Sequence, residues 1–542
     1  SFGMMYMKKW IALAISSTLA TGCSLTPWQS DSAANETIQT VPAEPVAEPV
    51  ETNALLEAEA IAENSEVEPA VIELTPQQEA DLWQRIRRQL TMEAPELPRL
   101  VSQRNWYLNN PYYMERVAKR AQPFMYMIVD EIERRGMPLE LALLPIVESA
   151  FDPFAYSHGR AAGVWQFIPG TARHYGLEIN WWYDGRRDVY AATHAALDYL
   201  DALQKRFDGD WLHALAAYNS GEGRVAGSIR RNKRAGKPTD FWSLDLPRET
   251  RAYVPKLLAL ADILKNYDDY AKHWLPIDNK PYLAVVEAHS QIDLAKAAEI
   301  AELDLDTLHH YNSAYNRWAT DPVGPHRLLL PIENASKLQA WLATADSKEL
   351  VQWTRHQVKS GESLLVIAKQ YHTTAKAIQQ ANNISGHIIR AGDHLLVPVA
   401  TRDLDEYSLS AEQRLVSKQS QSRGAYKVEH EVVSGDTLWD ISREYNVNLR
   451  SLASWNGMAP TDPLRPGKKL VVWLPHSEKP AGVVRSLHYK VRSGDSLARI
   501  ASRFNVSITD IEKWNQINRN NYLQPGQQLK LYVDVTRLNT QS

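Results

Sequence analysis

The last third of the chain repeats one pattern three times in a single register, and this repeat limits the possible fold more than any other feature. Each copy opens with a Ser-Gly pair. Counted from Gly361, Gly435 and Gly494, a leucine follows after three residues, an isoleucine after six, an aromatic residue after ten and an asparagine after twenty-one. Each copy closes with a strand-like run such as HLLVP or KLVVW. Internal periodicity of this kind indicates one small supersecondary unit that is used repeatedly.

This pattern resembles the LysM module, a strand-helix-helix-strand unit that binds glycans containing N-acetylglucosamine. The resemblance implies that the glycan is contacted by the loop after the first strand and by the loop before the last strand. It assigns glycan contacts in the second and third copies to Gly435, Asp436, Thr437, Leu438, Gly494, Asp495, Ser496 and Leu497.

Residues 284–331 carry a weaker form of the same pattern. Counted from Gln291, the positions after three, six, seventeen and twenty-one residues hold Leu294, Ala297, Leu308 and Asn312, and HRLLLP closes the segment. The opening Ser-Gly pair is absent and the last loop is longer. A divergent LysM-like unit and a helical connector with chance matches both remain open.

From Thr75 to about residue 270 the pattern is helical. Pro76 follows Thr75 at a favourable first helical position. Segments such as DLWQRIRRQL and VYAATHAALDYLDALQKRF repeat apolar residues at intervals of three and four, which predicts amphipathic helices. Gly and Pro cluster between these segments and predict the turns.

One carboxylate stands out in the helical part, because Glu148 lies within the apolar run LELALLPIVESAFDP. Burial disfavours the charged form of a carboxyl and raises its pKa. A neutral carboxylic acid near pH 7 can protonate the leaving oxygen of a glycosidic bond. Taken alone, this segment still favours a Glu buried in a structural hydrogen-bond network.

Two later segments change that balance. HGRAAGVWQFIPGTARHYG leads through a glycine-rich loop to a helix start, and ALAAYNSGEGRV ends a helix in Tyr218 and Asn219. In this order the segments resemble the lytic transglycosylase domain related to goose-type lysozyme. The matching motifs are Glu148-Ser149, Gly163-Val164-Trp165-Gln166, Pro169-Gly170-Thr171-Ala172 and Ala217-Tyr218-Asn219-Ser220-Gly221, with Tyr253 as a later tyrosine. The family has Leu-Met where this chain has Val164-Trp165.

The resemblance implies a catalytic Glu148 that acts first as acid and then as base. It implies that Gln166, Tyr218 and Asn219 position the sugar and that Tyr253 bonds near the Glu. Ser149 contacts the substrate or supports the loop. The product would be a 1,6-anhydro-muramyl end, and no water would be consumed.

Ordinary glycosidases use two carboxylates that flank the bond. The candidates for a second one are Asp152, Glu140 and Glu222, and none stands out as a nucleophile. This favours the one-carboxylate lytic transglycosylase over a lysozyme-like hydrolase. A non-catalytic wall-binding protein is disfavoured because the site residues are intact.

The N-terminal part predicts export. Lys8 and Lys9 precede an apolar stretch that ends at Leu19-Ala20-Thr21-Gly22-Cys23, and Cys23 is the sole cysteine. This resembles a signal peptide with a bacterial lipobox, which implies a lipid anchor on Cys23. The expected location is the periplasmic side of the outer membrane in a Gram-negative bacterium, with a soluble periplasmic protein as the alternative.

Charge is unevenly distributed along the chain. Residues 24–73 hold 11 Asp and Glu and no Lys or Arg, which predicts a disordered acidic tether. Residues 355–542 hold 25 Lys and Arg against 17 Asp and Glu, which suits an anionic polymer. Peptidoglycan strands are the expected partner. Nucleic acid is disfavoured because basic runs and zinc-finger spacing are missing from the sequence. The 16 His show no HExxH motif, so neither a metal nor a cofactor is expected.

The tryptophans and one charged corner receive structural interpretations. Trp181 and Trp182 either stack on sugar or pack at a helix end. Trp439, Trp455 and Trp514 are expected in small cores, and Arg186-Arg187-Asp188 is expected to form an ion-pair corner.

The predicted fold class is multidomain, with a mainly α lysozyme-like catalytic domain and small α+β (βααβ) LysM modules. The expected segments are a signal peptide (1–22), a tether (23–74), a catalytic domain (75–271), a connector or LysM-like unit (272–350), LysM 1 (355–399), a linker (400–428), LysM 2 (429–475), a linker (476–487) and LysM 3 (488–533).

Overall fold

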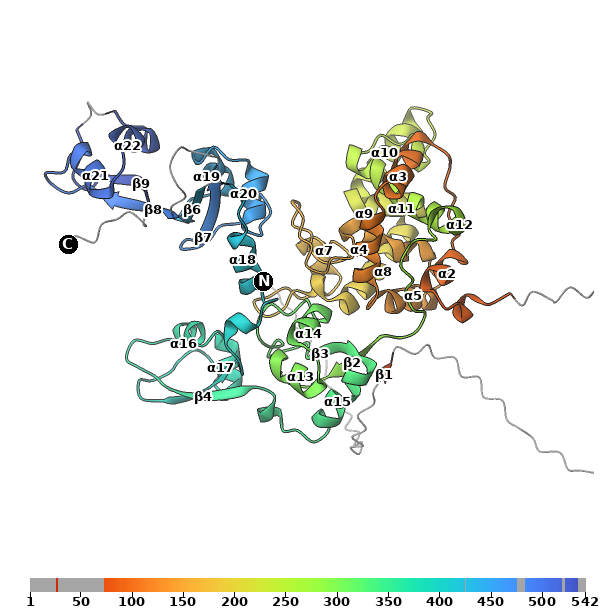
Figure 1. Ribbon diagram of the computed structural model, residues 1–542, viewed down its shortest axis with the longest axis horizontal. Helices are drawn as coiled ribbons and strands as arrows, with labels where there is room; N and C mark the ends of the chain where they lie inside the picture. The colour runs from red at the N-terminus through yellow and green to blue at the C-terminus, as the bar shows by residue number, and fades with distance from the viewer. Residues whose placement is uncertain (1–25, 28–72, 425, 475–482, 519–521, 535–542) are drawn as a thin grey trace, which may run out of the picture.

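The computed structural model describes residues 26–27, 73–424, 426–474, 483–518 and 522–534. A helical body lies to one side of Figure 1, and smaller units with short sheets lie to the other. Within the described part of the chain, no helix has both the length and the apolar character needed to cross a membrane. The predicted signal peptide and Cys23 lie outside the described residues.

The helical body contains the residues expected for the catalytic domain, and it has one continuous apolar core. The long helix α11 (Arg248–Lys265) runs through this core, with residues such as Val254, Leu257 and Leu258 fully buried. The other helices are α2 (Leu82–Arg87), α3 (Pro98–Leu108), α4 (Pro111–Ala121), α5 (Met125–Arg134), α6 (Leu144–Ser149), α7 (Pro169–His174), α8 (Val189–Arg206), α9 (Trp211–Ser220), α10 (Glu222–Arg234) and α12 (Tyr267–Tyr270). The prediction of a mainly helical domain is confirmed.

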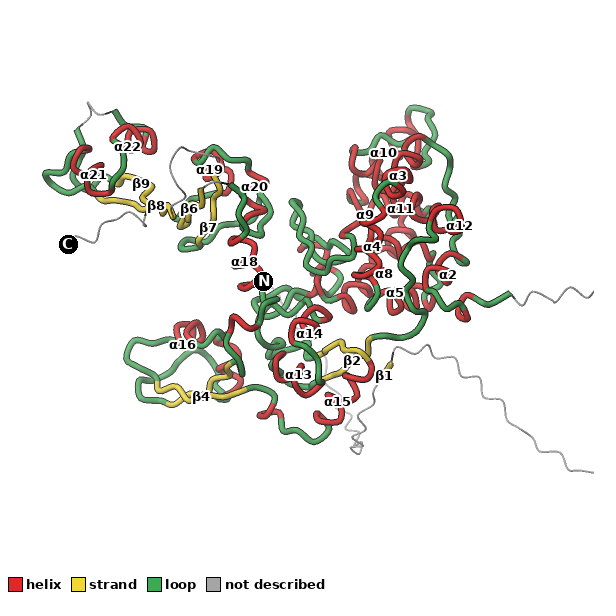
Figure 2. The backbone as a smooth tube through the Cα atoms, viewed as in Figure 1, coloured by secondary structure: helices red, strands yellow, loops and turns green. Residues whose placement is uncertain are grey.

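The C-terminal repeats each have the strand-helix-helix-strand order predicted for LysM units, with the two strands antiparallel. In Figure 2 each unit shows two short helices beside a small sheet. The first unit consists of β4 (Gln352–Gln357), α16 (Leu364–Gln370), α17 (Ala375–Ala381) and β5 (His394–Val399). The second consists of β6 (Tyr426–Glu431), α19 (Leu438–Glu444), α20 (Leu449–Trp455) and β7 (Lys469–Leu474). The third consists of β8 (Val483–Lys490), α21 (Leu497–Phe504), α22 (Ile508–Asn515) and β9 (Gln528–Asp534).

Residues 283–331 have the same order of elements, namely β2 (Leu283–Glu287), α13 (Leu294–Ala301), α14 (Leu305–Tyr311) and β3 (Arg327–Pro331). The helix α15 (Ile332–Leu342) follows directly. Most of the expected tether lies outside the described residues, but Thr26–Pro27 (β1) pairs antiparallel with β2.

The repeated asparagine has a structural role in all four units. In the second unit the Asn456 side chain donates to the Leu452 and Val471 carbonyls and accepts from the Val471 amide. This arrangement ties the end of the second helix to the closing strand. Asn312, Asn382 and Asn515 make the same set of bonds in the other units. The sequence match at Asn312 therefore reflects a shared geometry.

The two segments predicted as linkers, 400–428 and 476–487, both contain regular structure, because a helix lies in the first and β8 begins in the second. The expected linker 400–428 contains the helix α18 (Ala411–Ser420), which lies between the second LysM unit and the helical body in Figure 1. The strands of the second and third units join in one four-stranded sheet of order β7-β6-β8-β9, in which β6 and β8 are parallel.

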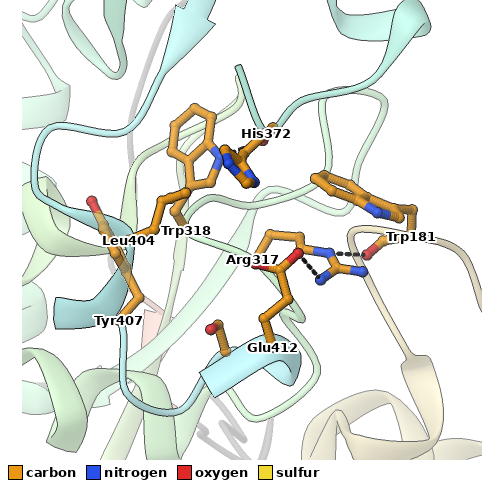
Figure 3. Close-up of a pocket in the computed structure, with 8 residues that line it drawn as sticks. Trp181, Arg317, Trp318, His372, Leu404, Tyr407 and Glu412 are labelled. Carbon is orange, nitrogen blue, oxygen red and sulfur yellow. Dashed lines mark hydrogen bonds and ion pairs between the residues drawn. The ribbon is translucent and has the colours of Figure 1, made fainter. Parts of the chain in front are cut away.

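The Trp pair packs at a junction between units. Trp182 donates from Nε1 to Thr374 Oγ1 of the first LysM unit, at 3.1 Å. The Arg317 guanidinium lies 4.2 Å from the centre of the Trp181 ring and pairs with Glu412 of α18, beside a small cavity (Figure 3). These contacts favour the packing interpretation of Trp181 and Trp182. The prediction for Trp439 is wrong, because its side chain is 54% exposed and Arg443 lies over its ring.

We expect Asn312→Ala to destabilise the β2–β3 pair by about 2 kcal/mol, because the Leu329 amide and carbonyl lose their partner inside the protein. Hydrogen exchange of the β2 and β3 amides should become faster while exchange in α11 stays unchanged. Ser336→Ala, which removes an exposed hydroxyl on the neighbouring α15, is the control. Unchanged exchange at Leu329 in Asn312→Ala would contradict the bracing role.

Candidate active site

Glu148 lies near the end of the short helix α6 and faces the helix α11. Tyr253 of α11 is buried, and its hydroxyl donates a hydrogen bond to Glu148 Oε1. Burial raises the pKa of the Glu148 carboxyl to about 8, against the hydrogen bond from Tyr253, which lowers it. The negative charge of Glu249 raises this pKa further and that of Lys256 lowers it. Glu148 is therefore mostly protonated at neutral pH, as the sequence predicts for an acid catalyst.

The chain leaves α6 through a strained turn. Ala150 and Phe151 have φ of 50° and 57°, in the left-handed region that residues with a Cβ rarely occupy. Just before this turn, the single hydroxyl proton of Ser149 is shared between two carbonyl acceptors, with Oγ 3.0 Å from the Pro145 oxygen and 2.9 Å from the Val164 oxygen. Between substrate contact and support of the loop, this geometry favours support of the loop as the role of Ser149.

The loop that carries Gln166 packs tightly against the Arg186 backbone. Gly163 has a φ of 81°, and a Cβ at this position would come within 1.7 Å of the Arg186 carbonyl oxygen, so glycine is required. Gln166 has a φ of 52° and donates from Nε2 to the carbonyls of Gly163 and Ala155. These bonds fix the direction of the Gln166 amide.

Trp165 is one of the two residues, with Val164, at which this chain departs from the family motif. Its side chain is fully buried and donates from Nε1 to Thr193 Oγ1 of α8 at 3.0 Å. A buried indole needs such an acceptor. Its carbonyl accepts from the Tyr218 hydroxyl at 2.7 Å. The Trp165 side chain thus anchors the loop on α8, and the backbone of the same residue anchors the loop on α9.

Asn219 is held from α11. Thr250 is buried and donates from Oγ1 to Asn219 Oδ1 at 2.8 Å. Ser149 and Tyr218 thus both bond the loop that carries Gln166. Tyr253 and Thr250 of α11 hold Glu148 and Asn219. Sequence reasoning missed Thr193 and Thr250 as supports. Their only signal was a hydroxyl on an apolar helix face.

The three candidates for a second carboxylate have other surroundings. Glu140 is buried, and its Oε1 accepts from the Thr91 and Met92 amides. Asp152 accepts from the Phe154 amide within its own turn. Glu222 opens α10 at the surface.

The charged corner at residues 186–188 is structural. Arg186 pairs with Asp184 at 2.9 Å, and Arg187 lies 3.6 Å from the same carboxylate. Asp188 caps α8 and pairs with Arg327 of β3 at 2.5 Å. The corner therefore joins the helical body to the unit at residues 283–331.

The predicted glycan-contact residues of the LysM units shape their first loop. Asp436 accepts from the Val433 amide, and its Oδ2 lies 3.0 Å from His430 Nε2. Asp495 is held in the same way by the Arg492 amide and the Tyr489 hydroxyl. Gly435 and Gly494 occupy left-handed turns, Thr437 and Ser496 cap the following helices, and Leu438 and Leu497 are buried.

No cluster of His, Cys, Asp and Glu suited to a metal ion occurs among the residues that the structure describes.

Comparison with known families matches this architecture. Residues 125–241 match the family described as "Transglycosylase SLT domain", and residues 356–398, 430–473 and 489–531 match "LysM domain". Residues 282–347 match "Lytic transglycosylase MltD, LysM-like domain", which overlaps the segment that the sequence left open. Together with the site geometry, these matches define a lytic transglycosylase with LysM repeats.

The chain is 39% identical over 413 residues to "Membrane-bound lytic murein transglycosylase D" of Escherichia coli strain K12, covering 74% of this chain and 87% of that protein. The chain therefore belongs to the membrane-bound lytic murein transglycosylase D family.

Two further similarities are partial. An autolysin of Enterococcus faecalis is 32% identical over 175 residues, covering 30% of this chain and 23% of that protein. The crystal structure of the soluble lytic transglycosylase SLT70 from Escherichia coli matches with 19% identity and a TM-score of 0.23, covering 36% of this chain and 35% of that one.

The raised pKa of Glu148 predicts a pH profile. Activity that needs the protonated acid should fall as the pH rises above about 8. Tyr253→Phe removes a hydrogen bond that stabilises the carboxylate, so the pKa of Glu148 should rise and the descending limb should move to higher pH. The measurement is kcat/KM against pH for both proteins. A limb that moves to lower pH in Tyr253→Phe would contradict this assignment.

Proposed function

We propose that Glu148 is the acid and then the base with which this peptidoglycan lytic transglycosylase cuts its substrate. The bond cleaved is the β-1,4 bond between N-acetylmuramic acid and N-acetylglucosamine. The observation that carries the proposal is the buried Glu148 carboxyl, which accepts a hydrogen bond from Tyr253 and whose pKa is raised to about 8 by burial.

The proposed reaction has two steps. Glu148 first gives its proton to the glycosidic oxygen, and the bond from this oxygen to C1 of the muramyl residue breaks. The acetamido oxygen of the same sugar stabilises the cation at C1. The muramyl 6-hydroxyl then attacks C1 while the Glu148 carboxylate takes its proton. Glu148 is thereby restored, the product carries a 1,6-anhydro ring, and no water is consumed.

The surrounding residues suit binding of an N-acetylated sugar. Gln166, Tyr218 and Asn219 lie on the loop and the helix end beside Glu148, and each is half-buried. Their internal hydrogen bonds fix the direction of their remaining donors and acceptors before substrate arrives, which lowers the cost of binding. Tyr253 adjusts the acidity of Glu148 and steadies the carboxylate once the proton has left.

The alternative is a lysozyme-like hydrolase that admits water. A hydrolase of that kind uses a second carboxylate to activate water or to form a covalent intermediate. Glu140 accepts from the Thr91 amide, and Asp152 accepts from the Phe154 amide within its own turn. These bonds and the surface position of Glu222 favour the single-carboxylate reaction.

Glu148→Gln should lower turnover on purified sacculi by about 100- to 10,000-fold, because an amide can neither donate the acid proton nor act as a base. Binding to sacculi should be unchanged. Mass spectrometry of the products separates the two reactions, since anhydro ends lack one water relative to reducing ends. Glu222→Gln is the matched control and should behave as wild type. Near wild-type turnover in Glu148→Gln, or reducing ends from wild type, would reject the mechanism.

The LysM units bind peptidoglycan, and we propose that the loops at residues 433–438 and 492–497 make the contacts. Removal of residues 355–542 should therefore weaken binding to sacculi more than it lowers turnover on short soluble strands. Cosedimentation with sacculi and product release from soluble strands measure the two effects. Equal losses in both assays would contradict a targeting role.

We further propose that Cys23 carries a lipid anchor after removal of residues 1–22, and that the enzyme works on the periplasmic side of the outer membrane. The lipobox-like sequence and the family support this location. We also propose that residues 75–271 form the catalytic domain and that residues 23–74 form the tether between this domain and the lipid anchor.

A further inference from the structure

The second LysM unit touches the catalytic domain at a loop close to Gln166. Asp462 lies in the turn before β7, and its two carboxylate oxygens accept from the Tyr156 hydroxyl at 2.9 and 2.8 Å. The same carboxylate lies 2.9 Å from Nε of Arg160. Tyr156 and Arg160 belong to the loop that leaves Glu148 and leads to Gln166.

The contact reaches Gln166 in one further step. Ala155 precedes Tyr156, and its carbonyl accepts from the Gln166 side chain at 3.4 Å and from the Gly163 amide at 3.0 Å. A displacement of Tyr156 would therefore move one of the two carbonyls that direct the Gln166 amide, and through the Gly163 amide it would also disturb the residue that supplies the other carbonyl. The Arg160 carbonyl is fixed in turn by Arg186, so the loop is held at several points.

A second contact holds the same loop from α18. Arg414 lies 4.5 Å from the centre of the Phe154 ring, in the geometry of a cation–π contact. Gln419, which lies in the same helix as Arg414, donates from its side chain to Asn456 Oδ1 of the second LysM unit at 2.9 Å. Phe154 and Tyr156 are thus both fixed by elements outside the catalytic domain.

The acid at this turn belongs to the second unit alone. Counting back five residues from the glycine that closes the turn gives Asp462 before Gly467, His387 before Gly392 and Asn521 before Gly526. The general LysM pattern therefore does not call for an acid here. The side chain of Asp462 is 14% exposed, so its charge is well desolvated and its bonds count for more than those of a surface pair.

We propose that Asp462 is a positioning residue of the active site, through which the second LysM unit fixes the Tyr156 loop and with it Gln166. This inference rests on the proposed role of Gln166 in holding the sugar. The unit then has two tasks, since it binds the glycan and holds the loop that leads to Gln166.

The test compares Asp462→Asn and Tyr156→Phe with wild type in the full-length protein. The substrate is a short soluble peptidoglycan oligosaccharide that cannot span both sites. Each variant should raise KM by about three- to ten-fold and leave kcat within about two-fold, because loss of a charge-assisted hydrogen bond loosens substrate binding. The KM of the double variant should not exceed that of the single variant with the higher KM, because both substitutions act through one contact.

Glu429→Gln is the control, since it removes a charge from the same unit away from the catalytic loop. Asp462 also accepts from the Ala459 amide within its own turn, so Asp462→Asn can disturb the unit itself. Tyr156→Phe avoids this problem because it breaks the contact from the catalytic side. Melting curves of all variants check that the units remain folded.

The proposal is overturned if both variants keep the KM of wild type on the short substrate, or if KM rises on sacculi alone, which would mean that the unit is a tether only. It is also overturned if Tyr156→Phe acts while Asp462→Asn does not. The products of wild type and Glu148→Gln in the same assay test the reaction separately, so failure of the positioning role leaves the mechanism intact.

Discussion

Desolvation of the Glu148 carboxyl is the constraint on which the site depends. A carboxyl in water would be ionised at neutral pH and could not protonate a glycosidic oxygen. The apolar environment around α6 keeps Glu148 protonated, and Tyr253 limits the rise of its pKa to about 8. A pKa near the working pH lets one group give and then take a proton in the same catalytic cycle. The shared apolar core and the hydrogen bond from Tyr253 to Glu148 together fix how α6 and α11 lie against each other.

The core and the helix periods followed from the sequence because burial patterns are local and periodic. The LysM units followed from the threefold repeat and its resemblance to a known module, and Asn312 marked the divergent unit correctly because its bonds require an amide at that position. Trp439 was misplaced because a tryptophan at an apolar-looking position can cover a helix surface, here beneath Arg443. Periodicity does not show which face of a seven-residue helix has a neighbour.

The site was only partly predictable. Motif order brought Glu148, Gln166 and Tyr253 together, yet it gave no sign that Thr193 supports Trp165 or that Thr250 holds Asn219. These supports come from helices far along the chain, and a threonine on a helix looks the same whether or not it meets a partner. The contact of Asp462 with Tyr156 spans 306 residues, and nothing local in either segment announces it.

Backbone strain explains why the active-site loop needs support from outside its own domain. Ala150, Phe151, Arg160 and Gln166 all have left-handed φ values between 50° and 66°, within the stretch that runs from the end of α6 to Gln166. Each such residue costs about 1 kcal/mol or more and persists where its surroundings over-determine it. Ser149 and Arg186 supply part of that determination from the helical body. Arg414 contacts Phe154 and Asp462 contacts Tyr156, and both of these loop residues lie in sequence between Ser149 and the Arg160 carbonyl that Arg186 holds. A LysM unit docked at this point holds the loop in a conformation that the catalytic domain alone would hold less firmly.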